Sequence, residues 1–313
     1  MTFPDAHLIQ TNGIRLAVHE AGEGQPLVLC HGWPEQAYSW RYQVEPLVQA
    51  GYRVIIPEQR GYGNSDKPEA VEAYDAQQLS RDLTGLLDHY GYDQAVFVGH
   101  DWGAINVWNL ALLYPERVKA IINLSVPYLV RGATDWVTFW EQMLGPDFYI
   151  VHFNRQPGVA EKVFDANVEN FLRNMYRTDF WNEPPRDPGP GMALINLAYL
   201  NPEELPGHLM MDQEELDVFV QAFKSGGFTA PINWYRNFTR NWQLLADVDE
   251  VIDKPTLMIH GKYDMVPALD NLTDYVPGAE VHTLACGHWI QQEKPQETNA
   301  LILDWLARQN FQP

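Results

Sequence analysis

The sequence predicts an α/β fold in which helices cover both faces of a mostly parallel sheet and a helical segment is inserted. Three observations support this prediction. Short apolar runs alternate with amphipathic helical patterns over the first 130 residues. Residues 131–250 are instead helical, irregular and rich in aromatic side chains, and strand-like sequence returns at 256–259. We therefore expect one core domain, residues 1–130 and 251–313, with a helical cap at 131–250.

Strands are expected where a short apolar run lies between turn residues. Apolar and polar positions alternate over residues 7–26, around the turn signals at 12–13 and 22–24, and an apolar run follows at 27–30. The other strand candidates are residues 53–56, 95–98, 120–124, 256–259 and 280–284. Because helical patterns separate most of them, these strands are expected to form a mostly parallel sheet that is covered on both faces.

Two helices have recognisable ends. The first has Asp75 as its expected N-cap and Gly91 just past its C-terminus. The second begins near Pro295, a residue suited to the first turn of a helix. Their apolar stripes are Leu79, Leu83, Leu86, Leu87 and Tyr90 in the first and Leu301, Ile302, Trp305 and Leu306 in the second. Within the insertion, a Pro/Gly-rich stretch at 183–191 interrupts the helical pattern.

Composition limits the classes of partner. The 313 residues are 46% hydrophobic and 20% charged, which is typical of a globular chain. A formal net charge of −20 argues against nucleic acid or an anionic membrane surface as a partner. No apolar run approaches the roughly 18 residues of a membrane span, and the N-terminus lacks the pattern of a secretory signal. We expect a cytoplasmic protein; its oligomeric state is not predicted.

The strand expected at 95–98 runs directly into a glycine-framed turn at 99–103. This spacing is that of the nucleophile elbow GxSxG, with Asp101 at the serine position and an apolar helical segment at 104–113. The alternative is an aspartate that only caps this following helix. The strand-turn-helix context favours Asp101 as a nucleophile.

A carboxylate at this position suits a particular chemistry. Aspartate, with an ordinary pKa of about 4, is ionised without a general base and can attack a saturated carbon that bears a leaving group. The product of that attack is an ester on the enzyme. Hydrolysis of the ester requires a histidine base, an acid that orients the histidine, and an oxyanion hole.

Candidates for these roles follow other predicted strands. Asp264 and His288 lie just beyond the strands at 256–259 and 280–284, in the chain order acid then histidine that this type of site shows. The backbone N–H groups of Trp33 and Trp102 are candidates for the oxyanion hole. The alternatives are that His288 is an ordinary loop histidine and that the segment after residue 31 is only a glycine-proline turn.

Metal and cofactor chemistry have no support in the sequence. HExxH, paired CxxC and P-loop spacings are absent, so we expect neither a metal nor a cofactor. Cys30 and Cys286 are too few for a disulfide framework and are expected to pack in the core.

Five segments together resemble the α/β-hydrolase-fold epoxide hydrolases, in the order that this family shows. They are HGWPE at 31–35, RGYGNSDKP at 60–68, GHDWGA at 99–104, NWYRN at 233–237 and ACGHW at 285–289. The resemblance covers nearly the whole chain and implies the α/β-hydrolase fold.

The resemblance also implies an activity, the conversion of a small-molecule epoxide and water to a vicinal diol through an ester on Asp101. Two cap tyrosines hold and protonate the epoxide oxygen in this family, and Tyr235 in NWYRN matches one of them. Tyr149 resembles the other, although its spacing to the PGVAE segment is about one residue longer than the family pattern. Glu35 is either a water or proton relay or a solvated loop carboxylate.

Two other functions stay open at this point. Haloalkane dehalogenases share the GHDWG and HGxP segments, but they commonly have asparagine where Trp33 stands. A hydrolase-fold protein that binds a small molecule without turning it over is the second alternative, because a fold does not imply a function.

Overall fold

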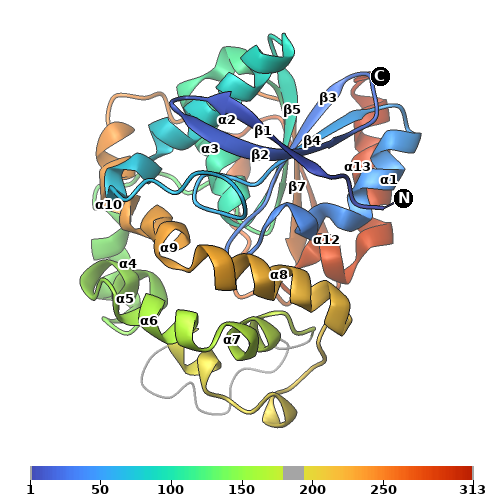
Figure 1. The fold of residues 1–313 in the computed structure, drawn as a ribbon. Helices are drawn as coiled ribbons and strands as arrows, with labels where there is room; N and C mark the ends of the chain where they lie inside the picture. The colour runs from blue at the N-terminus through green and yellow to red at the C-terminus, as the bar shows by residue number, and fades with distance from the viewer. Residues whose placement is uncertain (1, 179–193, 312–313) are drawn as a thin grey trace.

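The computed structural model describes residues 2–178 and 194–311, so the Pro/Gly-rich stretch at 183–191 lies outside the described residues. Its centre is an eight-stranded sheet (Figure 1) with the strand order β1-β2-β4-β3-β5-β6-β7-β8. The strands are β1 Ala6–Thr11, β2 Ile14–Ala21, β3 Pro26–Cys30, β4 Arg53–Pro57, β5 Ala95–His100, β6 Val118–Leu124, β7 Thr256–Gly261 and β8 Ala279–Leu284. Within the described ranges, no helix is both long and apolar enough to cross a membrane.

The sheet is mostly parallel, as predicted. Strand β2 pairs antiparallel with β1 and β4, and every other neighbouring pair is parallel. The register places Cys30 of β3 beside Gly99 of β5, and His100 of β5 beside Leu124 of β6. The residues that follow these strands therefore emerge at one edge of the sheet, where sites in such folds form.

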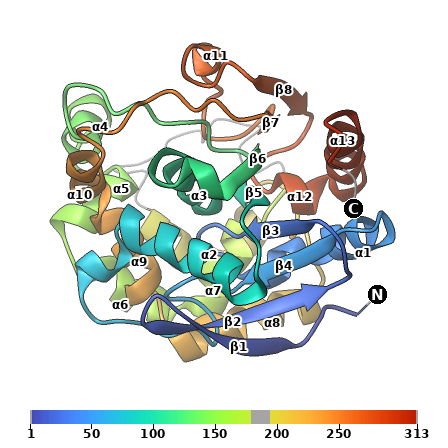
Figure 2. The same cartoon turned by 90° about the horizontal axis from the view of Figure 1, so that it is seen from above.

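Helices cover both faces of the sheet, which is clearest in the view along its edge (Figure 2). On one face, Val28 of β3 belongs to a core cluster with α2 and α3, whereas Leu27 and Leu29 pack on the other face with α1 and α13. This alternation is the period of two expected for a strand buried on both sides. The helices of this part are α1 Arg41–Gln49, α2 Ala76–Tyr90, α3 Trp102–Leu113, α11 Leu272–Tyr275, α12 Ile290–Glu293 and α13 Pro295–Arg308.

The predicted helix ends are confirmed. The Asp75 side chain accepts a hydrogen bond from the backbone N–H of Gln78, and Gly91 ends α2 in the left-handed conformation with φ of 74°. Helix α13 begins at Pro295. Cys30 and Cys286 are buried free thiols, and burial raises the pKa of both, so neither is a thiolate nucleophile.

Among the described residues, seven further α-helices lie between β6 and β7 in the chain. They are α4 Trp136–Leu144, α5 Tyr149–Arg155, α6 Val159–Ala166, α7 Val168–Met175, α8 Gln213–Gly226, α9 Thr229–Arg236 and α10 Phe238–Leu244. In Figure 1, α5 to α8 form a layer below the sheet. Their aromatic side chains belong to a third core cluster, which also includes Trp33 from the loop after β3 and Trp102 from the start of α3. These helices therefore cover the edge of the sheet at which the candidate site residues emerge.

Candidate active site

Asp101 stands at the tip of a tight turn between β5 and α3. Its backbone has φ of 51° and ψ of −118°, an uncommon conformation for a residue other than glycine. The frame of the turn leaves no room for side chains, since a Cβ on Gly99 would lie 2.6 Å from the backbone of Ala104. The two glycines thus allow the elbow predicted from the sequence, and such local strain is concentrated at functional sites.

The Asp101 carboxylate is nearly enclosed, with an exposed fraction of 8%. The backbone N–H of Trp33 donates to its Oδ1 atom over 2.7 Å, and the backbone N–H of Trp102 is close enough to favour the charged carboxylate. Burial raises the pKa of Asp101, while the charge of His288 and these two donors oppose that rise. The structure therefore brings together the nucleophile candidate and both oxyanion-hole candidates.

His288 lies between two carboxylates. Its Nδ1 atom is 2.9 Å from Oδ1 of Asp264, and its Nε2 atom is 3.7 Å from Oδ2 of Asp101. Burial disfavours the imidazolium, but the negative charges of Asp264 and Asp101 outweigh it and raise the pKa of His288 to about 9. Burial also opposes ionisation of Asp264, yet His288 and a hydroxyl donor hold the pKa of that carboxyl below its ordinary value. The three predicted residues thus form one hydrogen-bonded and electrostatic unit.

Tyr149 and Tyr235 come together from two different helices, α5 and α9. Their ring centroids are 5.7 Å apart in edge-to-face geometry. The side chain of Asn154 joins the two helices by donating to the carbonyl of Tyr235 over 3.0 Å. Burial, together with the nearby charge of Asp101, raises the pKa of both phenols, so both are protonated donors at neutral pH.

Aromatic rings fix the position of Tyr235. Its ring lies 5.4 Å from that of Trp33 and 5.1 Å from that of Trp102, both in edge-to-face geometry. Tyr235 therefore packs on the side chains of the same two residues whose backbone N–H groups contact Asp101.

Glu35 is fully buried, so the alternative of a solvated loop carboxylate is wrong. Its Oε2 atom accepts from the backbone N–H of Gly32 over 2.8 Å and lies 2.7 Å from Nδ1 of His100. Its Oε1 atom accepts from the side-chain amides of Gln291 and Gln292, each over 3.1 Å. Burial disfavours the charged carboxylate, but His100 and the Gly32 N–H lower the pKa of Glu35 below its ordinary value. Glu35 thus joins the loop after β3 to the elbow.

His100 has a polar partner at each ring nitrogen. Nδ1 faces the Glu35 carboxylate, and Nε2 lies 2.8 Å from the backbone carbonyl oxygen of His288. The buried ring of the residue before Asp101 therefore connects Glu35 with the backbone of the histidine loop.

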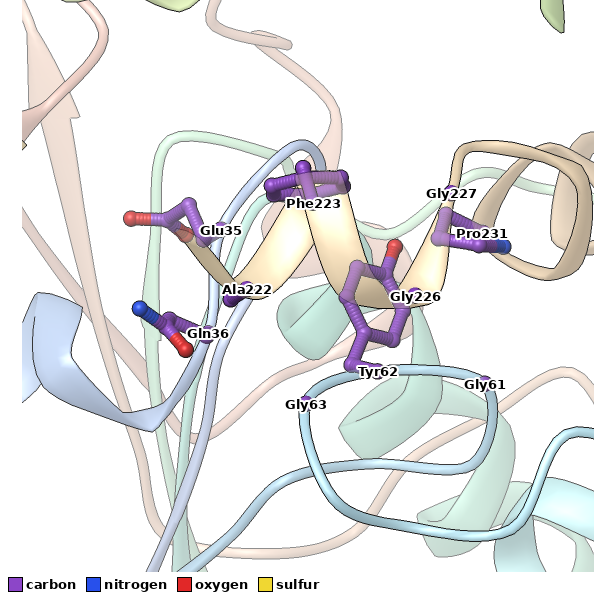
Figure 3. A pocket seen from close by; sticks show the side chains of 10 residues that line it. All are labelled: Glu35, Gln36, Gly61, Tyr62, Gly63, Ala222, Phe223, Gly226, Gly227 and Pro231. Atoms are coloured by element: carbon purple, nitrogen blue, oxygen red, sulfur yellow. The ribbon is translucent and has the colours of Figure 1, made fainter. Parts of the chain in front are cut away.

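A small hollow adjoins this network (Figure 3). Glu35 and Gln36 line one side, the end of α8 lines another, and Tyr62 extends between them from its glycine-rich loop. The Tyr62 hydroxyl is buried without a hydrogen-bond partner among the described residues. Burial and the charges of Asp101 and Glu35 raise its pKa well above the ordinary value, so this hydroxyl is neutral.

The end of α7 contacts both loops that carry the predicted residues. The hydroxyl of Tyr176 donates to the carbonyl of Pro34 over 2.6 Å. The indole N–H of Trp289 donates to the carbonyl of Met175 over 3.0 Å. The rings of Tyr176 and Trp289 also pack 4.9 Å apart. One helix end thus holds the loop of Trp33 and the loop of His288 together.

Sequence reasoning missed His100, Ser125 and Tyr176. His100 lies inside the GHDWGA segment, and its position before Asp101 was a usable signal. Ser125 directly follows the strand predicted at 120–124, as Asp264 and His288 follow theirs. Tyr176 has no local signal, because its contact with Pro34 joins residues 142 positions apart.

The fold and this arrangement define a protein of the α/β-hydrolase fold with aspartate at the elbow. In agreement, a family described as alpha/beta hydrolase fold matches residues 25–295. Epoxide hydrolase A of Mycobacterium tuberculosis is 42% identical, with 98% of each chain covered. Epoxide hydrolase 2 of Siraitia grosvenorii is 36% identical over 96% of this chain and 97% of its own.

Solved structures agree with these relatives. The crystal structure of epoxide hydrolase A from Mycobacterium thermoresistibile superposes with a TM-score of 0.88 at 42% identity, covering 97% of this chain and 98% of that one. The chain therefore belongs to the epoxide hydrolases of the α/β-hydrolase fold.

Proposed function

We propose that this protein hydrolyses a small-molecule epoxide to a vicinal diol through an ester on Asp101. The observation that carries this proposal is the pair of protonated phenols, Tyr149 and Tyr235, placed near the charge of Asp101. An epoxide oxygen leaves as an alkoxide that stays on the product, so it needs acidic hydrogen-bond donors. A halide is a weak base and does not need acidic donors to leave. The relatives' names as epoxide hydrolases support the same reaction.

In the first step, a carboxylate oxygen of Asp101 attacks one carbon of the epoxide. The C–O bond of the ring breaks, and the electron pair goes to the epoxide oxygen, which takes a proton from Tyr149 or Tyr235. Removal of an enclosed phenol donor from the oxygen is expected to slow this step strongly. The product is an ester of Asp101 with a neighbouring hydroxyl.

In the second step, His288 takes a proton from water as the water oxygen attacks the ester carbonyl. The Trp33 and Trp102 N–H groups stabilise the tetrahedral oxyanion. Its collapse releases the diol and the Asp101 carboxylate, and the proton on His288 returns to the phenolate. Because esterification removes the Asp101 charge, the pKa of His288 falls from about 9, which favours the neutral base.

The segment at 131–250 then acts as a cap that supplies the oxygen donors, while 1–130 and 251–313 supply the other groups. Glu35, through Gly32 and His100, holds the oxyanion loop and the elbow in place. The aromatic surroundings of Asp101, formed by Trp33, Trp102 and residues of α5 and α9, favour an apolar aryl or alkyl substituent on the epoxide.

The test offers the purified protein styrene oxide and 1-chlorobutane in parallel, and follows diol by chromatography and halide by a colorimetric assay. We expect diol without halide. Halide without diol would assign a dehalogenase instead. The absence of both products would favour a binding protein. The Asp101→Ala variant is the control for uncatalysed opening of the epoxide.

A further inference from the structure

Ser125 makes contact with both the acid and the base of the site. It is fully buried and directly follows β6. Its hydroxyl donates to Oδ2 of Asp264 over 2.6 Å, and its Oγ atom lies 2.9 Å from Nδ1 of His288. The side chain of Ser125 therefore bridges Asp264 and His288, and the proposed function gives it no role.

The hydrogen-bond directions fix the protonation of His288. Because the Ser125 hydroxyl donates its hydrogen bond to Asp264, its Oγ atom faces Nδ1 of His288 as an acceptor. Oδ1 of Asp264 faces the same nitrogen over 2.9 Å. Two acceptors at Nδ1 require the proton to be there. In the neutral ring the lone pair is then on Nε2, the nitrogen that points toward Asp101.

The backbone of Ser125 has a conformation that favours glycine. Its φ is 71°, in the left-handed region that glycine adopts without steric cost and serine does not. A serine held in this region at a site is a form of local strain that the surrounding contacts must offset. What serine adds over glycine here is the hydroxyl between Asp264 and His288.

We propose that Ser125 is a positioning residue for ester hydrolysis: it holds the second oxygen of Asp264 and keeps the Nδ1 proton of His288 in place. This inference rests on the proposed covalent route. Because His288 acts as a base only in the second step, the loss of the hydroxyl should slow hydrolysis of the ester and leave its formation unchanged.

The test compares wild type with Ser125→Gly, which suits the left-handed backbone and removes the hydroxyl together with its carbon. Single-turnover mixing with styrene oxide, followed by intact-mass spectrometry, measures formation and decay of the ester separately. We expect formation at the wild-type rate and decay slowed about tenfold or more, the effect of losing a hydrogen bond to a charged group. The control is Asn310→Gly, an exposed position with φ of 55°, where both rates should stay unchanged.

A decay rate equal to that of wild type, or an equal slowing of both steps, would overturn the role of Ser125. Ser125→Cys, which retains a weak donor, provides a second variant if Ser125→Gly does not fold, and its decay should be slowed by an intermediate factor. The absence of any ester in His288→Gln as well would overturn the covalent route itself, and with it this inference.

Discussion

The Nε2 atom of His288 lies 3.7 Å from Oδ2 of Asp101, beyond the length of a hydrogen bond. The nucleophile candidate is thus held by the backbone N–H of Trp33 on its Oδ1 atom and receives no direct hydrogen bond from the base on Oδ2. Under the proposed function, this geometry leaves one carboxylate oxygen available for attack. It would also keep the imidazole close enough to act on a water molecule near the proposed ester.

Replacement of His288 should separate the two proposed steps. His288→Gln removes the base but leaves Asp101 and its donors, so the ester should form and persist while turnover falls more than about a thousandfold. Intact-mass spectrometry after mixing with styrene oxide should show the protein mass increased by one substrate. An unmodified mass, with substrate binding retained, would count against an ester on the enzyme. Asp101→Ala should show neither adduct nor diol.

The two phenols should act on the first step. Tyr149→Phe and Tyr235→Phe each remove one donor to the developing alkoxide and should slow ester formation by about a hundredfold, with a larger loss in the double variant. Stopped-flow tryptophan fluorescence would measure this rate, because Trp33 and Trp102 lie beside Tyr235. Full activity in the double variant would place the oxygen donors elsewhere. Tyr199→Phe, an exposed position, is the matched control.

The pKa of His288 should depend on the charge of Asp101. In the wild type it should be about 9, and Asp101→Asn should lower it because one of the carboxylates that stabilise the imidazolium becomes neutral. Nuclear magnetic resonance titration of the ring measures both values. The raised pKa also stabilises the fold: this contribution is complete below the unfolded value of about 6.5 and is lost as pH rises through about 9. An unchanged pKa in the variant would contradict the coupling.

Glu35 should contribute strongly to stability. Glu35→Ala leaves Nδ1 of His100 and the Gly32 N–H buried without their partner, so we expect a loss of about 3–5 kcal/mol in the free energy of unfolding. Urea denaturation measures it. Glu35→Gln, which keeps an acceptor oxygen, should lose less, and Glu169→Gln in a surface ion pair should change little. Similar losses for Glu35→Ala and Glu169→Gln would show that the buried pair does not stabilise the fold.

The parts predicted well from the sequence are those with a strong local signal. The strands before Asp101, Asp264 and His288 are short, fully apolar or flanked by glycine, and their carboxyl ends meet by the geometry of a parallel sheet. The ends of α2 have residues that favour caps. The elbow and the chain order of the acid and the base then indicate the chemistry.

Other parts depend on contacts that no local pattern shows. Helix α1 was not predicted, because it has an internal Pro46 and its buried face includes Gln43 beside only two apolar residues. The burial of Glu35 depends on Gln291 and Gln292, 256 and 257 positions further along the chain. The ends of α4 to α10 were not predicted, since aromatic residues recur throughout the segment and blur the helical period.

The bonds from the end of α7 limit how related enzymes of this fold can be recombined. A chimera that takes its helical segment from another parent would keep Asp101 and His288. It would lose an anchor of each loop, however, unless the donor parent supplies a hydroxyl at position 176 and places the backbone carbonyl of residue 175 within reach of Trp289. Crossover points for such chimeras therefore belong where Met175, Tyr176 and the loops of Pro34 and Trp289 are inherited together.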